Sequence, residues 1–137
     1  MAVINKNINP QTLISTLWVF ILLNMVFRDI HQFGHAGFLE EMMTGVVNGV
    51  VITEELMLLG GFLAEIPILM VLLSRILTNQ INKWANIVAS ALTMLVLLSA
   101  LPSADMDDLF FLIAELFAFI SIIRIAWNLP HQKVQIK

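Results

Sequence analysis

Apolar side chains recur in four long runs that are separated by shorter polar segments. The runs cover about residues 12–30, 54–77, 83–101 and 106–129. Each approaches the roughly 20 residues that a helix needs to cross a bilayer. Thr53 stands in an N-cap position before the second run, and Pro102 and Pro130 close the last two. The pattern predicts one all-α domain over residues 1–137, an integral membrane bundle of four antiparallel helices.

The composition indicates that lipid, not water, surrounds most of the chain. Apolar residues make up 59% of the sequence and charged residues 12%, with a mean hydropathy of +0.90. A soluble domain carries about a quarter charged residues. The net charge of −3 and the seven Lys and Arg residues give no basic surface for nucleic acid. The absence of Cys excludes disulfides and thiolate chemistry. We therefore expect the bilayer as a partner and no nucleic acid.

The connections between the runs differ in length. Residues 78–82 and 102–105 are so few that consecutive helices must pack as antiparallel neighbours. The outer loop, residues 31–53, is longer and contains the apolar pairs Phe38/Leu39, Met42/Met43 and Val46/Val47. Pairs at this spacing are typical of a short interfacial helix, which we expect to end near Asn48 and Gly49. The segment is either a structural cap or a mobile lid over an outward-facing site.

The basic residues indicate an orientation. Lys and Arg collect in cytoplasmic loops, and a four-span arrangement leaves Arg28 alone on one side, with the others opposite: Lys6, Arg75, Lys83, Arg124, Lys133 and Lys137. Trp84 and Trp127 fall at the same boundary as these residues, where indole rings favour the membrane interface. We expect a multi-pass protein of a bacterial inner (plasma) membrane with both termini in the cytoplasm.

Four polar residues lie inside the predicted spans: Asn24, Arg28, Glu65 and Glu115. An ionisable side chain at bilayer depth costs about 2.5–3.5 kcal/mol on insertion scales, so such groups usually face the bundle interior and find partners. Asn24 and Arg28 share one helix face because they are four residues apart. The long stem of Arg28 reaches inward, so we expect it to contact Glu115.

Glu65 lies in unusual local sequence. Gly61 precedes it by one turn on the same face, and Pro67 follows it and is expected to kink the helix. These residues are either packing elements or part of a site. We predict an outward-facing polar pocket for a small ligand, an ion or a proton, lined by Asn24, Arg28, Gly61, Glu65 and Glu115.

The two histidines of the outer loop, His31 and His35, are candidates for pH sensing or metal binding. Carboxylates occur nearby in the sequence, at Asp29, Glu40 and Glu41, and imidazole and carboxylate are ligands of divalent metals. Spacing alone does not predict a metal site, because ordinary interfacial packing accounts for the same residues. A pH-responsive role lies between these interpretations.

The sequence contains no pattern that commits it to a reaction. It has no Cys, no Tyr, no nucleophile motif and no Gly-rich phosphate loop. We therefore favour a non-enzymatic protein and expect no catalytic residue, no cofactor and no bound metal.

Two stretches carry a resemblance to known membrane proteins: His35-Ala36-Gly37-Phe38 and Glu55-Leu56-Met57-Leu58-Leu59-Gly60-Gly61. With the four-helix architecture, they resemble the DoxX-like families of small bacterial membrane proteins, which are largely uncharacterised. The resemblance implies an inner-membrane protein that is sometimes associated with redox or quinone-linked partners. It supplies no catalytic residues.

Three functions fit the sequence. The leading hypothesis is a membrane protein whose pocket binds a small apolar or ionic ligand. The second is a scaffold or accessory subunit, in which the buried polar groups only fix helix packing and a larger membrane protein is the partner. The third is a small multidrug-type transporter that works as a homodimer, although such transporters carry their membrane Glu in the first helix, where this chain has Asn24.

Overall fold

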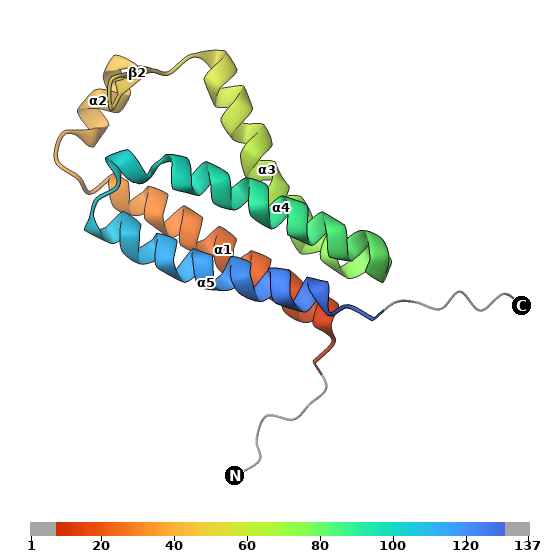
Figure 1. The fold of residues 1–137 in the computed structure, drawn as a ribbon. Helices are drawn as coiled ribbons and strands as arrows, with labels where there is room; N and C mark the ends of the chain where they lie inside the picture. Colours follow the sequence, from red (N-terminus) through yellow and green to blue (C-terminus); the bar gives the residue numbers. More distant parts are fainter. Residues whose placement is uncertain (1–7, 131–137) are drawn as a thin grey trace, which may run out of the picture.

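Four long helices make up most of the structure. The computed structural model describes residues 8–130 (Figure 1). The long helices are α1 (Pro10–Gln32), α3 (Glu54–Ile76), α4 (Asn79–Ser99) and α5 (Met106–Trp127). All four are long and apolar enough to cross a membrane. The predicted all-α bundle is therefore confirmed.

Side-chain caps explain where three of the helices begin. Asn9 accepts a hydrogen bond from the backbone N–H of Gln11, and Thr53 accepts one from Leu56. Asp105 accepts a longer one, of 3.4 Å, from Asp108. Such caps satisfy N–H groups that the first helical turn leaves free. The predicted N-cap role of Thr53 is confirmed.

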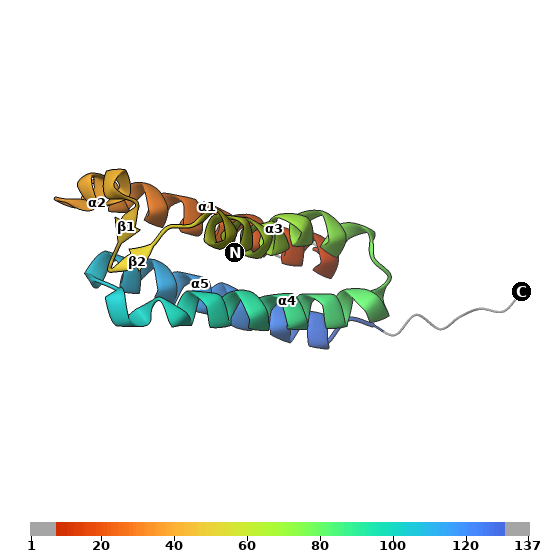
Figure 2. The same cartoon turned by 90° about the horizontal axis from the view of Figure 1, so that it is seen from above.

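Each long helix has two neighbours. α1 packs against α3 and α5, and α4 packs against the same two helices. Seen from above, α1 and α3 form one layer and α4 and α5 the other (Figure 2). Residues Pro10 and Trp127 lie at one end of the bundle, called here the terminal end, and the loop between α1 and α3 lies at the opposite end, called the hairpin end (Figure 1).

The connection between α3 and α4 is shorter than predicted. α4 begins at Asn79, so only Leu77 and Thr78 link the two helices, and the expectation of a loop over residues 78–82 is wrong. The polar residues at the start of α4 suggested a loop, but Asn82 is fully buried and donates to the backbone carbonyl of Ser74. At the other end of α4, a 3-10 turn, η1 (Leu101–Ser103), contains Pro102.

The outer segment contains a short helix followed by a hairpin. Helix α2 (Phe38–Thr44) confirms the predicted helix, but it ends earlier than expected. Strands β1 (Val46–Val47) and β2 (Val50–Val51) pair antiparallel. Asn48 and Gly49 connect them with positive φ angles of 50° and 77°, which a two-residue hairpin turn requires. No residue of α2, β1 or β2 is buried.

The core lies between α1, α5 and parts of the other two helices. Trp18 and Phe119 are fully buried, and their rings meet edge to face at 5.8 Å. α3 contributes little to this core, because its only buried residues are Pro67, Met70 and Ser74. The first half of α3 leans away from the other helices (Figure 1). Pro67 has no backbone N–H to donate to Leu63, which favours bending at this point.

Charged residues are separated between the two ends of the bundle. The terminal end carries Arg75 and Arg124 in the last turns of α3 and α5, and Lys83 near the start of α4. There the Lys83 ammonium lies 4.0 Å from the ring of Trp127, whose ring meets that of Trp84 at 6.3 Å. At the hairpin end of the described chain, most charged side chains are acidic, and Arg28 is the basic one. Lys6, Lys133 and Lys137 lie outside the described residues.

Candidate functional site

An ion pair between α1 and α5 forms the centre of the candidate site. Nη1 of Arg28 lies 3.3 Å from Oε2 of Glu115. The Glu115 side chain is 0% exposed and that of Arg28 is 16% exposed. A buried carboxylate is costly unless it is paired, so α1 supplies the charge that permits Glu115 within α5. The expected contact between these two residues is present.

Carboxylates outnumber cations around this pair. Asp29 lies beside Arg28, with a distance of 3.9 Å between Oδ1 and Nε, and Asp108 lines the same cavity as both. Within the described chain, Oε1 of Glu115 and Oδ1 of Asp108 are buried without a hydrogen-bond partner. The surroundings of Arg28 therefore contain more acceptors than donors.

A polar cavity of about 230 Å³ opens at this point, near the hairpin end. Its polar walls come from α1, η1 and α5, through Arg28, Asp29, Gln32, Ser103 and Asp108. Apolar residues complete the lining, among them Leu97 and Leu112. The cavity is large enough for a small polar group and has no second basic side chain in its lining.

An apolar pocket of about 210 Å³ lies on the other side of Arg28, between α1, α3 and α4. Arg28 and Thr93 are the only side chains in its lining with polar groups. The hydroxyl of Thr93 is buried without a hydrogen-bond partner among the described residues. Because Arg28, Leu97 and Ala100 line both hollows, the Arg28 side chain is a shared wall between a polar and an apolar space.

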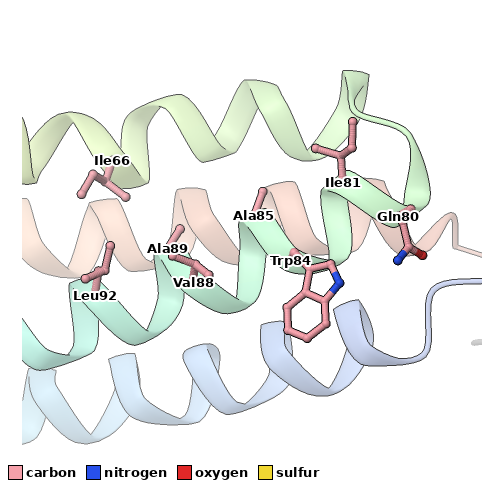
Figure 3. Close-up of a pocket in the computed structure, with 8 residues that line it drawn as sticks. All are labelled: Ile66, Gln80, Ile81, Trp84, Ala85, Val88, Ala89 and Leu92. Atoms are coloured by element: carbon pink, nitrogen blue, oxygen red, sulfur yellow. The ribbon is translucent and has the colours of Figure 1, made fainter.

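An open groove of about 630 Å³ continues from the apolar pocket along α4, with Ile66 of α3 at its edge. Ile66 and Leu92 line both the pocket and the groove. Figure 3 shows the groove residues along α4, from Leu92 to Trp84 and Gln80 near the terminal end, with Ile66 of α3 opposite. Three adjoining hollows thus run from a polar end at Arg28 to an apolar surface.

The structure does not bring all five predicted pocket residues together. Arg28 and Glu115 meet, but the half-buried Asn24 donates to the Phe20 carbonyl of its own helix at 2.8 Å. Glu65 and Gly61 are exposed and line a shallow hollow formed by α3 alone. The expectation that these two residues face the bundle interior is wrong, because the first half of α3 diverges from the bundle.

A buried polar network near the terminal end was not predicted. Nε1 of Trp18 donates to Oδ1 of Asn86 at 2.7 Å, and the Ser74 hydroxyl donates to the same oxygen at 3.0 Å. The side-chain amide of Asn86 donates to the backbone carbonyl of Asn82 at 2.9 Å. All four side chains are buried. Polar residues spaced three or four apart on α4 are the signal that sequence reasoning missed: Asn82, Asn86, Ser90 and Thr93.

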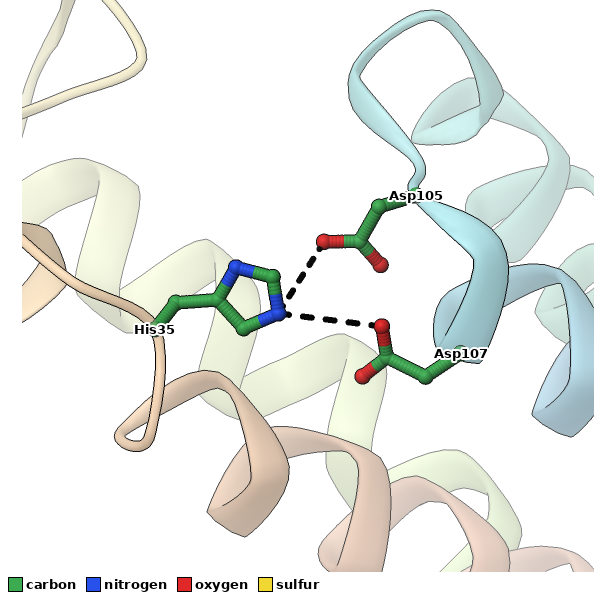
Figure 4. A group of neighbouring side chains, drawn as sticks. All are labelled: His35, Asp105 and Asp107. Carbon is green, nitrogen blue, oxygen red and sulfur yellow. Dashed lines mark ion pairs between the residues drawn. The ribbon is translucent and has the colours of Figure 1, made fainter.

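The outer histidines find partners that the sequence did not indicate. Nε2 of His35 lies 3.2 Å from Oδ2 of Asp105 and 3.7 Å from Oδ1 of Asp107 (Figure 4). Nδ1 of His31 lies 3.6 Å from the other Asp107 oxygen. The nearby acids of the sequence, Asp29, Glu40 and Glu41, do not pair with either histidine.

One protein-family model matches almost the whole chain. The model of DUF6326, a family of unknown function, matches residues 1–134. The chain belongs to this family. No curated protein and no solved structure matches it. Membership in DUF6326 assigns no activity to the chain.

Proposed function

We propose that this DUF6326 chain binds a small amphipathic molecule with a cationic or hydrogen-bond-donating head. The observation that carries the proposal is the position of Arg28 between a polar cavity and an apolar pocket. A molecule with a head in the cavity and a tail in the pocket would contact both. The proposal refines the polar pocket for a small ligand, ion or proton that the sequence suggests.

The chemistry of the head follows from the polar groups left without partners. Within residues 8–130, Oδ1 of Asp108 and Oε1 of Glu115 are buried and accept no hydrogen bond; Asp108 lines the cavity, and Glu115 is paired with Arg28 of the same lining. A buried acceptor without a donor costs about 1–3 kcal/mol. An amine or a hydroxyl group would donate a hydrogen bond to these oxygens, and a quaternary ammonium would offset their negative charge, whereas a carboxylate or phosphate would add another acceptor.

The chemistry of the tail follows from the pocket and groove beyond Arg28. Their linings are formed almost entirely by apolar side chains of α3 and α4. From Leu97 to Ile81 the path follows about 24 Å of α4 at 1.5 Å per residue. Ligand sites are typically apolar hollows with a few polar groups that fix orientation, and Arg28 and Thr93 fill that role here.

The binding test compares amphiphiles that differ in the head group. The chain is placed in nanodiscs of neutral lipid and titrated with decyltrimethylammonium or decanoate, and its thermal unfolding is followed. We expect a saturable rise in unfolding temperature with the cation only. Asp108→Asn should weaken the effect about tenfold, since a charge-assisted contact is lost. The exposed acid Glu40 on α2 offers a matched control, Glu40→Gln, which should leave it unchanged.

Three results would contradict ligand binding of this kind. They are an equal response to both head groups, an unchanged response in Asp108→Asn, and an unchanged response when Leu92→Trp fills the apolar pocket. Each would show that the amphiphile partitions into lipid rather than into the hollows at Arg28.

We further propose a bacterial inner membrane as the location, with the terminal end in the cytoplasm. The basic residues Arg75, Lys83 and Arg124 support this orientation through the positive-inside rule. The bacterial origin and the DoxX-like relationship are supported only by the two resembling stretches. Two reporters are fused in turn to the C-terminus, one that is active only in the cytoplasm and one that is active only in the periplasm. We expect activity of the first alone, and activity of the second would refute the orientation.

Self-association is a second candidate role, and Glu65 is the observation that favours it. Glu65 is exposed, and in the described chain it makes no hydrogen bond and no ion pair. It lies about 16 Å along α3 from Glu54, at 1.5 Å per residue, a depth at which a lipid-facing acid is costly. A second copy would supply a polar partner, because a two-fold interface places the same residues on both sides.

The surface around Glu65 has the shape that such an interface needs. Phe62 is 67% exposed and stands beside a hollow at Gly61, where nothing lies within 4 Å of an added Cβ atom. A projecting ring next to a hollow is self-complementary when two copies meet, and glycine permits close helix approach. This arrangement favours a homodimer over an unrelated scaffold partner. A homodimer is also what the transporter hypothesis requires.

A further inference from the structure

Four side chains at the hairpin end combine imidazole and carboxylate ligands. His31 and His35 come from the end of α1 and the loop after it, and Asp105 and Asp107 come from the start of α5. One ligand atom each from His35, Asp105 and Asp107 lies within 4.8 Å of the others. Figure 4 shows both carboxylates directed at the same nitrogen of His35.

The distances between these atoms match those of a metal site. Bonds from Zn²⁺ to His nitrogen or carboxylate oxygen are about 2.0–2.2 Å long, which places neighbouring ligands of a tetrahedron about 3.3–3.6 Å apart. Nε2 of His35 lies 3.2 Å from the Asp105 oxygen and 3.7 Å from the Asp107 oxygen. The ligand oxygens of Asp105 and Asp107 lie within 4.8 Å of each other, so the two carboxylates need to approach by at most about 1.5 Å for all three atoms to share one ion.

The hydrogen-bond inventory also favours a cation. A neutral imidazole has one N–H and can donate it to one of the two carboxylates. Asp105 already uses its other oxygen to cap α5, by accepting from the backbone of Asp108. A divalent ion would attract both carboxylates and accept the lone pair of His35 at the same time.

His31 lies beside Asp107, next to the carboxylate oxygen that does not face His35. Its Nδ1 lies 3.6 Å from Oδ2 of Asp107, while Oδ1 of the same carboxylate faces His35. Metal-binding side chains are usually held by a second layer of polar partners. His31 is placed to orient Asp107, and a fourth position of a tetrahedron would remain for water.

We propose that His35, Asp105 and Asp107 bind a divalent transition-metal ion of the Zn²⁺ class. Imidazole with carboxylate suits Zn²⁺, whereas Mg²⁺ and Ca²⁺ prefer oxygen ligands alone. The ion would connect the loop after α1 to the first turn of α5, two segments that are separated by about 70 residues of sequence. This proposal is independent of ligand binding at Arg28.

The test measures metal binding directly. Chelator-treated full-length protein in neutral detergent is titrated with Zn²⁺ by calorimetry, and Co²⁺ is used as a spectroscopic probe of tetrahedral geometry. We expect one Zn²⁺ per chain and a rise in unfolding temperature on binding. His35→Ala and Asp107→Asn should abolish the binding, and His31→Ala should weaken it about 10- to 100-fold, as removal of a supporting partner does.

Matched controls separate this site from non-specific binding. His131→Ala removes the third histidine of the sequence, and Glu40→Gln removes an exposed acid of α2, so both variants should bind Zn²⁺ like the native chain. Circular dichroism of each variant verifies the helical fold. Absence of saturable binding, or stoichiometric binding that persists in folded His35→Ala and Asp107→Asn, would overturn the proposal and leave simple ion pairs.

Discussion

Arg28 and Glu115 are 87 positions apart in the sequence, and their side chains meet with 3.3 Å between Nη1 and Oε2. The pair joins the first and last long helices of the bundle. Glu115 has no exposed surface, so it depends on Arg28 for its charge partner. The same Arg28 side chain separates the polar cavity from the apolar pocket. One interaction thus connects the stability of the fold with the shape of the candidate site.

Removal of Arg28 should destabilise the protein strongly. We expect Arg28→Met to lower the free energy of unfolding by about 3–5 kcal/mol, because it leaves a buried carboxylate without its partner. The double variant Arg28→Met/Glu115→Leu should lose much less, since no uncompensated charge remains. Denaturant unfolding in detergent measures both values. Equal losses in the single and double variants would show that the pair contributes mainly by packing.

The network around Asn86 should also be sensitive to substitution. Asn86→Ala leaves the Trp18 indole N–H and the Ser74 hydroxyl without the acceptor they share. We expect a loss of about 1–3 kcal/mol, the range for an unsatisfied buried polar group. Asn24→Ala is the matched control, because Asn24 bonds only to its own helix and should change stability little. The same unfolding assay applies, and a similar loss in both variants would argue against a role for the network.

Two glycines should respond in opposite directions to alanine. Gly49 has a φ of +77° in the hairpin turn, so Gly49→Ala should destabilise the hairpin by about 1–2 kcal/mol. Gly60 lies in α3 with nothing within 4 Å of an added Cβ atom, so Gly60→Ala should stabilise by up to about 1 kcal/mol. Hydrogen exchange over residues 46–51 reports the first effect, and thermal unfolding reports the second. Slower exchange in Gly49→Ala would contradict the assigned turn.

The proposed dimer should be detectable by cross-linking. The chain contains no Cys, so Leu58→Cys introduces a single thiol beside the Gly61 hollow and leaves Phe62 in place. We expect oxidation in native membranes to produce a disulfide-linked dimer of Leu58→Cys. Trp84→Cys, at another exposed position, should remain monomeric. Equal cross-linking of both variants would indicate random collision, and none in Leu58→Cys would refute a symmetric contact centred on Gly61.

Glu65 gives an independent measure of the same association. Glu65→Gln retains hydrogen-bonding groups, whereas Glu65→Leu removes them. We expect Glu65→Leu to lower the dimer fraction in analytical ultracentrifugation more than Glu65→Gln does, because interhelical polar contacts contribute to association in lipid. A monomeric native chain at all concentrations would exclude this role.

The sequence by itself determined the four long, membrane-capable helices, but not the start of α4 or the end of α2. Apolar runs of about 20 residues, with caps such as Thr53 and breakers such as Pro102, predicted four helices, because a helix satisfies its backbone groups within one segment and a barrel strand is only about half as long. The two short connections also predicted that α3 packs against α4 and α4 against α5, whereas the packing of α1 against α3 and α5 did not follow from them. The hairpin was also readable in principle, since Asn48-Gly49 between paired valines is a strong turn signal.

Tertiary structure alone decided which polar side chains meet. The sequence predicted that Glu65, like Glu115, faces the bundle interior. In the structure, α3 diverges from the bundle on the N-terminal side of Pro67, so Glu65 is exposed. His35 was grouped with nearby acids, whereas the structure pairs it with Asp105 and Asp107. Helical periodicity determines the face of each side chain on its own helix. The rotation and tilt of one helix against another depend on packing of the whole bundle, so contacts between distant residues become visible only in three dimensions.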